Sequence, residues 1–145
     1  MKTGLPRKQK GAVAIEFALV FVVFFAVFYA MISYSLPLLL MQSFNQATAE
    51  AVRRSVAIDP SSPGYTASVG PAAAEFARKQ LDWIPSAFQF LPGHVTGTFT
   101  GGVLKVEINY PSTNLKGVLP FIVLPGIGDL PKLPTMLHAQ SSLQF

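Results

Sequence analysis

Residues 11–41 read GAVAIEFALVFVVFFAVFYAMISYSLPLLLM and contain one charged side chain, Glu16. At about 1.5 Å of rise per residue, residues 17–41 alone form a helix long enough to cross the roughly 30 Å hydrocarbon core of a bilayer. The run is longer than the apolar part of a secretory signal, about 7–15 residues, and no small-residue cleavage site follows it. It therefore predicts a membrane-spanning helix that stays in the protein.

The net charge of +4 is concentrated ahead of this stretch. Lys2, Arg7, Lys8 and Lys10 precede Gly11, whereas the seven basic and seven acidic residues that follow it balance. Basic residues beside a span favour a cytoplasmic N-terminus and export of the rest of the chain. The excess charge thus belongs to the leader, and no nucleic-acid-binding face is predicted.

The helical pattern continues beyond the apolar run. Residues 42–57, QSFNQATAEAVRRSVA, keep small and apolar side chains roughly on one side, and Glu50 stands three and four residues before two arginines. That is the spacing of weak helical ion pairs. We expect a basic leader over residues 1–11 and one long helix over residues 12–57, with residues 12–41 in the membrane.

Residues 58–145 have the length of one small exported domain. We expect an amphipathic helix that opens at Pro71 and stops before Pro85. Its predicted buried face consists of Ala73, Phe76, Ala77, Gln80, Leu81 and Ile84, and its polar face of Arg78, Lys79 and Asp82.

Two strands are predicted after this helix, over residues 96–100 and 103–110, joined by two glycines. The second strand alternates apolar and polar residues, which is typical of a sheet with one buried face. Residues 121–124 are expected to be a short buried piece, and residues 135–145 a last strand that returns to the hairpin. The predicted fold class is therefore α+β: a long N-terminal membrane-spanning helix, one amphipathic helix and a short antiparallel sheet.

No catalytic constellation, metal site or cofactor site is predicted. The chain has no cysteine, and its two histidines, His94 and His138, have no acidic partner at ligand spacing. The GIGD sequence at residues 126–129 does not follow a strand in a strand–turn–helix unit, so it is no dinucleotide fingerprint. Trp83 is interpreted as a core anchor. We expect a protein that is not an enzyme.

The one motif with chemistry is KGAVAIEF at residues 10–17, which resembles the processing site of a prepilin. The resemblance implies cleavage between Gly11 and Ala12 by a prepilin peptidase. It makes Glu16 the fifth residue of the mature chain, with Phe17 where major Flp pilins tend to carry Tyr. A glycine suits the position before the scissile bond because it has no side chain to obstruct an active site.

The whole chain resembles the TadE-type minor pilins, or pseudopilins, of the tight-adherence (Tad/Flp) pilus. The resemblance rests on GAVAIEFALV, on QSFNQATAEAVRRSV and on a tail in which a strand ending in Tyr-Pro leads to a Pro/Leu-rich stretch and a last strand. It implies a subunit in pilus assembly and surface adhesion. The implied partners are the prepilin peptidase, other pilins and assembly proteins, and the inner membrane, with a periplasmic C-terminal domain. The related TadF type shares the N-terminal segment and stays open.

Glu16 and four phenylalanines are the residues that we expect to act in assembly. The resemblance to prepilins implies that in a bundle of helices Glu16 meets the mature N-terminal amine of a neighbour, such as that of Ala12. Spacings of four, three and four residues place the phenylalanines on one stripe of a helix: Phe17, Phe21, Phe24 and Phe28. The stripe is either ordinary lipid-facing surface or a packing seam against other pilins.

A second class of function remains open from the sequence. The chain is alternatively an uncleaved, signal-anchored periplasmic protein that binds an envelope partner and never joins a filament. Processing of the leader separates the two hypotheses.

Overall fold

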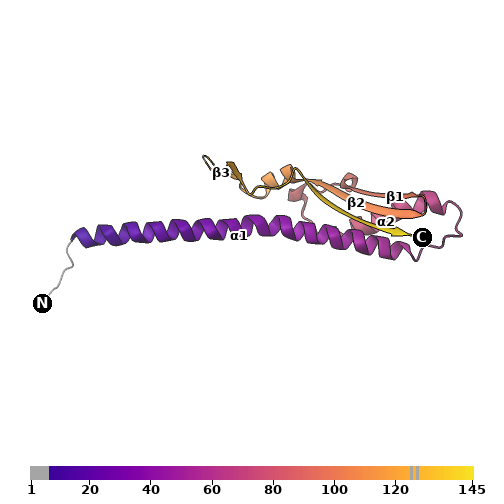
Figure 1. Ribbon diagram of the computed structural model, residues 1–145, viewed down its shortest axis with the longest axis horizontal. Helices are drawn as coiled ribbons and strands as arrows, with labels where there is room; N and C mark the ends of the chain where they lie inside the picture. Colours follow the sequence, from indigo (N-terminus) through magenta and orange to yellow (C-terminus); the bar gives the residue numbers. More distant parts are fainter. Residues whose placement is uncertain (1–6, 125, 127) are drawn as a thin grey trace.

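A computed structural model describes residues 7–124, 126 and 128–145. A long helix lies beside a small domain of one further helix and a sheet, so the molecule is elongated (Figure 1). The fold class is α+β, as predicted. The elements are α1 (Arg7–Ser55), α2 (Tyr65–Gln80), β1 (Val95–Thr100), β2 (Val103–Pro111), β3 (Ile122–Leu124), β4 (Gly128–Leu130) and β5 (Met136–Gln144).

Helix α1 has 49 residues and two different halves. From residue 11 to residue 32 every side chain is exposed except that of Tyr29, which is half-buried. Beyond residue 32, one buried side chain follows another at spacings of three and four, which is the stripe of a helix packed on a domain. The buried residues of this stripe are Ser33, Pro37, Leu40, Phe44, Ala47, Ala51 and Ser55. The helix therefore has two parts. Residues 11–32, called the rod below, project beyond the core of the domain, and residues 33–55, called the spine, pack on that core.

The helix begins before the predicted start and ends two residues before the predicted end. Arg7, Lys8, Gln9 and Lys10 are all good helix formers, so nothing in the leader stops the helix there. It also passes through Pro37, where the missing N–H leaves one helical hydrogen bond unmade.

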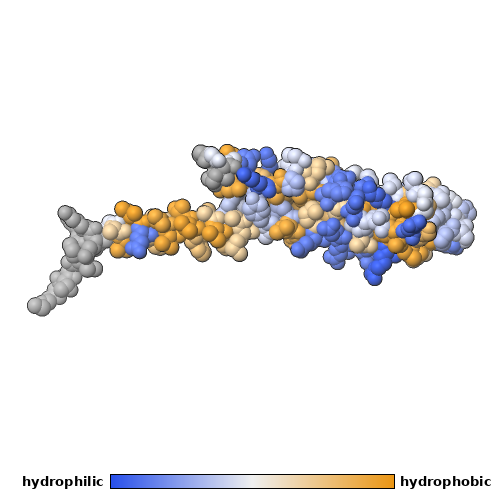
Figure 2. Space-filling model, in the orientation of Figure 1, coloured by the Kyte–Doolittle hydropathy of each residue, from blue (hydrophilic) through white to orange (hydrophobic). Residues whose placement is uncertain are grey.

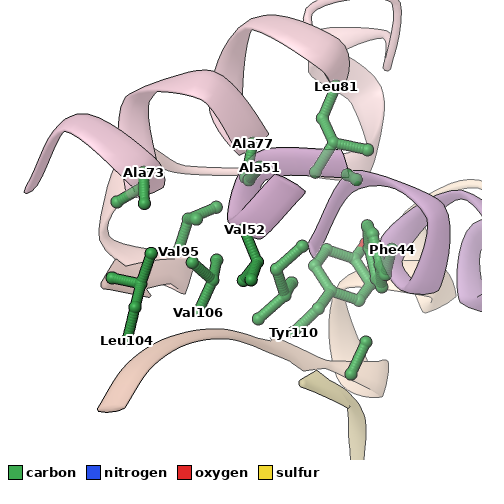
Figure 3. Packing of buried hydrophobic residues seen from close by; sticks show 14 of the residues in the cluster. Phe44, Ala51, Val52, Ala73, Ala77, Leu81, Val95, Leu104, Val106 and Tyr110 are labelled. Atoms are coloured by element: carbon green, nitrogen blue, oxygen red, sulfur yellow. The ribbon is translucent and has the colours of Figure 1, made fainter. Parts of the chain in front are cut away.

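The sheet has the order β1-β2-β5, with both pairs antiparallel. Both helices pack on the same face of it, and the core lies between the helices and β2 (Figure 3). The alternation predicted for β2 is confirmed, because Leu104, Val106, Ile108 and Tyr110 are fully buried. The Phe44 ring of α1 lies 5.8 Å from the Tyr110 ring, which joins the spine to the central strand.

Helix α2 begins six residues earlier than predicted, so Pro71 lies inside it. Pro71 cannot make one helical hydrogen bond, and two contacts hold the part of the helix before it against the sheet. Tyr65 is buried with its ring edge-on to Phe99 at 5.7 Å, and the backbone of Gly70 lies directly against that of Gly97 in β1. Burial of this first part of the helix depends on the sheet, which local sequence signals do not contain.

Three further predictions of burial were wrong. Arg78, placed on the polar face, is half-buried and donates to the carbonyls of Pro92 and Val95 at 3.1 and 3.0 Å. Trp83 is 52% exposed and anchors no core. The piece predicted to be buried from residue 121 is not buried over residues 121–123, because Phe121 is only half-buried and Ile122 and Val123 are 40% and 68% exposed.

The last strand returns to the sheet as predicted. Strand β5 pairs with β2 over its whole length, from Pro111 opposite Met136 to Val103 opposite Gln144. The β3–β4 hairpin lies apart from this sheet, alongside the middle of α1 (Figure 1).

Candidate functional site

The candidate site is the free half of α1. This helix is long and apolar enough to cross a membrane, and none of its most apolar window is buried in the protein. Residues 11–32 rise about 33 Å along the helix, which matches the hydrocarbon core of a bilayer. Figure 2 shows this half as an almost continuous hydrophobic rod that extends from the more polar domain. A rod of this kind fits a single-pass membrane anchor.

Gly11 and Ala12 lie in the helical part of the chain, and both are exposed. A Cβ added to Gly11 would meet nothing within 4 Å. A peptidase requires an extended backbone, so cleavage here would need the start of α1 to unwind. Glycine makes that opening easier, since it lowers helix stability by about 1 kcal/mol relative to alanine.

Glu16 lies four residues beyond Ala12, so the two residues share one side of the helix, one turn apart. The carboxylate is exposed between apolar neighbours, among them Phe17. Among the side chains described from residue 11 onward, none forms an ion pair with Glu16. The site thus presents one acidic group on an otherwise apolar surface.

The phenylalanine stripe is exposed along its whole length. Phe17 stacks on Phe21, and Phe24 on Phe28, each pair with ring centroids 6.2 Å apart. Phe25 also stacks on Phe21 at 6.2 Å, which the sequence analysis missed although the spacing of four residues predicts it. The rings form an exposed apolar edge on the helix.

Two tyrosines of α1 hold the β3–β4 hairpin against the helix, and the sequence analysis missed both roles. The Tyr29 hydroxyl donates to the Pro120 carbonyl just before β3. The Lys132 backbone N–H just after β4 donates to the Tyr34 hydroxyl at 3.1 Å. The pairs lie 91 and 98 residues apart in the chain, so no local pattern announces them.

The histidines have local partners. His94 Nδ1 accepts from the Leu91 N–H at 3.1 Å, and burial lowers the pKa of His94. His138 Nδ1 lies 2.7 Å from Asn109 Oδ1 on the neighbouring strand. Within the described part of the chain, no three His, Cys, Asp or Glu residues gather as a metal site would require.

The ion pairs predicted on the second half of α1 are present. Glu50 contacts Arg53 at 2.7 Å and Arg54 at 2.9 Å, and hydrogen bonds from Arg54 and then Arg53 lower the pKa of Glu50. The two arginines are exposed and Glu50 is half-buried, and pairs near the surface contribute little to stability.

The family described as TadE-like protein matches residues 11–53 of the chain. The match begins at Gly11 and ends two residues before the end of α1, so it covers the free rod and the spine of the domain. The resemblance of this segment is therefore confirmed, while the tail lies outside the match. No curated protein and no solved structure matches the chain.

Proposed function

We propose that this chain, TadE-like over residues 11–53, is a minor pilin or pseudopilin of a tight-adherence pilus. One observation carries the proposal: the matched segment coincides with a single helix that is an exposed apolar rod in its first half and the spine of a domain in its second. Such a helix suits a subunit that is anchored in a bilayer before assembly and packs on other helices afterwards. The role is structural rather than enzymatic.

The topology follows from the charges at the N-terminus. The basic leader over residues 1–11 stays in the cytoplasm, the rod crosses the inner membrane, and the domain from residue 58 onward is periplasmic. A prepilin peptidase cuts between Gly11 and Ala12 and leaves a mature chain that begins at the membrane boundary.

Assembly would then use the two features of the rod. Glu16 pairs with the Ala12 amine of a neighbouring subunit, because a charge in apolar surroundings gains most from an opposite charge. The phenylalanine stripe packs on neighbouring helices. Its centre lies about 140° around α1 from the face that the hairpin covers, at 3.6 residues per turn. All four rings are exposed, although Phe21 also lines the space beside the hairpin. The filament then supports surface adhesion.

The leader test comes first. The intact mass and N-terminal sequence would be measured with and without co-expressed prepilin peptidase. We expect a chain that begins at Ala12 only when the peptidase is present. Gly11→Leu should block cleavage, because a side chain then obstructs the active site, while the matched exposed substitution Ala14→Leu should not.

A chain that keeps Met1 under both conditions would contradict processing. The protein would then be an uncleaved anchored scaffold of the envelope. Equal cleavage of the Gly11→Leu and Ala14→Leu variants would instead show that the scissile bond does not follow Gly11.

A further inference from the structure

A cavity of about 320 Å³ lies between α1 and the β3–β4 hairpin. Residues of α1 from Phe21 to Tyr34 form one wall, with Ala26, Ala30 and Ser33 among them, and Ile122, Leu130 and Pro131 form the other. Nearly all of this lining is apolar. The small side chains of Ala26 and Ala30 leave the space that larger residues would fill.

The hairpin that closes the cavity is fixed in place at both ends. Tyr29 donates to the carbonyl of Pro120, two residues before β3, and Tyr34 accepts from the N–H of Lys132, two residues after β4. Tyrosine favours the membrane–water interface, where its ring is in apolar and its hydroxyl in polar surroundings. The two tyrosines thus place the cavity close to the boundary of the bilayer.

The length of α1 independently indicates the depth of the cavity in the bilayer. If the hydrocarbon core begins near Val13, just after the basic leader, about 30 Å of helix ends near Ile32. The α1 lining of the cavity runs from Phe21 to Tyr34, about 20 Å, so the cavity then extends from near the middle of the core to its outer boundary. At that depth the neighbouring molecules are lipids, and an apolar space of this kind suits an acyl chain.

Ser33 places a hydroxyl group in the cavity near the boundary of the hydrocarbon core. It is 2% exposed and lines the cavity, and within the described part of the chain its hydroxyl has no hydrogen-bond partner. A buried hydroxyl without a partner costs about 1–3 kcal/mol. The boundary of the hydrocarbon core is where phospholipids carry their ester carbonyls, which are acceptors for this hydroxyl.

A second cavity of about 400 Å³ continues beyond Tyr34, on the domain side of the boundary. Lys132 and His138 line it, and Lys132 is exposed. An ammonium group at this level lies within reach of a lipid phosphate. The exposed acid of the same hairpin, Asp129, lines a different cavity on the other side of Lys132.

We infer that the groove between α1 and the β3–β4 hairpin binds one phospholipid. Its acyl chain fills the cavity beside Ala26 and Ala30, Ser33 donates to an ester carbonyl, and Lys132 contacts the phosphate. The inference rests on the part of the proposed function that places α1 in a membrane, and it is independent of processing and of filament assembly.

The test is native mass spectrometry of the full-length protein in mild detergent, delipidated and then titrated with dioleoylphosphatidylglycerol. We expect one lipid per chain. Ala26→Phe fills the cavity and should weaken binding about tenfold or more. The same substitution at Ala18, which is exposed on α1 but does not line the cavity, should leave binding unchanged.

Ser33→Ala and Lys132→Gln should each weaken binding without preventing it, and neither touches the core of the domain. Equal lipid binding by the Ala26→Phe and Ala18→Phe variants would overturn the inference, as would a wild-type protein that binds no lipid. A species with the mass of two chains that Ala26→Phe removes would identify a second copy as the occupant and would overturn it too. None of these readings depends on the leader, so failure here is distinguishable from failure of the pilin proposal.

Discussion

Tyr110 contacts both the hydrophobic core and the loop segment around Phe88. Its ring is fully buried against Phe44, and its hydroxyl donates to the Phe88 carbonyl at 2.6 Å. Burial raises the pKa of Tyr110 to about 12, because the phenolate would lose its hydration. The neutral hydroxyl is therefore part of what holds the segment around Phe88 to the sheet.

This shift predicts a loss of stability in alkali. A folded-state pKa above the unfolded value of about 10 means that the stabilisation is complete below pH 10 and is lost as the pH rises through about 12. Denaturant unfolding between pH 9 and 12 would measure it. Tyr110→Phe should lose about 1 kcal/mol near neutral pH and show a shallower alkaline decline. An identical decline in both proteins would assign the loss to other groups.

Between secondary-structure elements, a close backbone contact joins α2 and β1. A Cβ on Gly97 would lie 2.1 Å from the Gly70 carbonyl oxygen, and a Cβ on Gly70 would lie 2.7 Å from the Gly97 oxygen. Both obstacles are backbone, so no side chain can rotate away. The two glycines allow the helix to lie directly on the strand.

Gly97→Ala should therefore destabilise the domain by about 1–3 kcal/mol, since the helix must move off the sheet. In a domain of this size, each kcal/mol lowers the Tm by roughly 4–8 °C. Thermal unfolding followed by circular dichroism would measure the change. Gly93→Ala is the matched control, because a Cβ there meets nothing within 4 Å. Equal Tm values for the two variants would show that the backbone contact is not tight.

At the scale of the whole molecule, the elements that the sequence predicted correctly are those whose hydrophobic residues follow a regular helical or strand period. The apolar run gives α1, and the alternation from Val103 to Tyr110 gives β2, because burial on one face imposes these patterns locally. The helix start at Tyr65 and the hairpin docked by Tyr29 and Tyr34 were missed, because they depend on contacts between distant segments. The same limit applies to the groove between α1 and the β3–β4 hairpin, whose two walls lie about 100 residues apart in the chain.

The last prediction concerns Glu16, which lies on the rod and outside the domain. In a filament its carboxylate would meet the N-terminal amine of a neighbour, and removing the charge would leave that amine unpaired in apolar surroundings. Glu16→Gln keeps the size of the side chain and lies outside the domain, so stability of the domain should not change. We expect the variant to be processed at Gly11 but depleted from sheared filaments.

The assay compares the sheared-filament fraction with the membrane fraction. Glu75→Gln is the control, because Glu75 is an exposed acid on α2, away from the rod. Its change should leave the distribution as in wild type. If Glu16→Gln entered filaments as well as wild type, the pairing with Ala12 would be excluded, and the phenylalanine stripe would have to set the register of the helices alone.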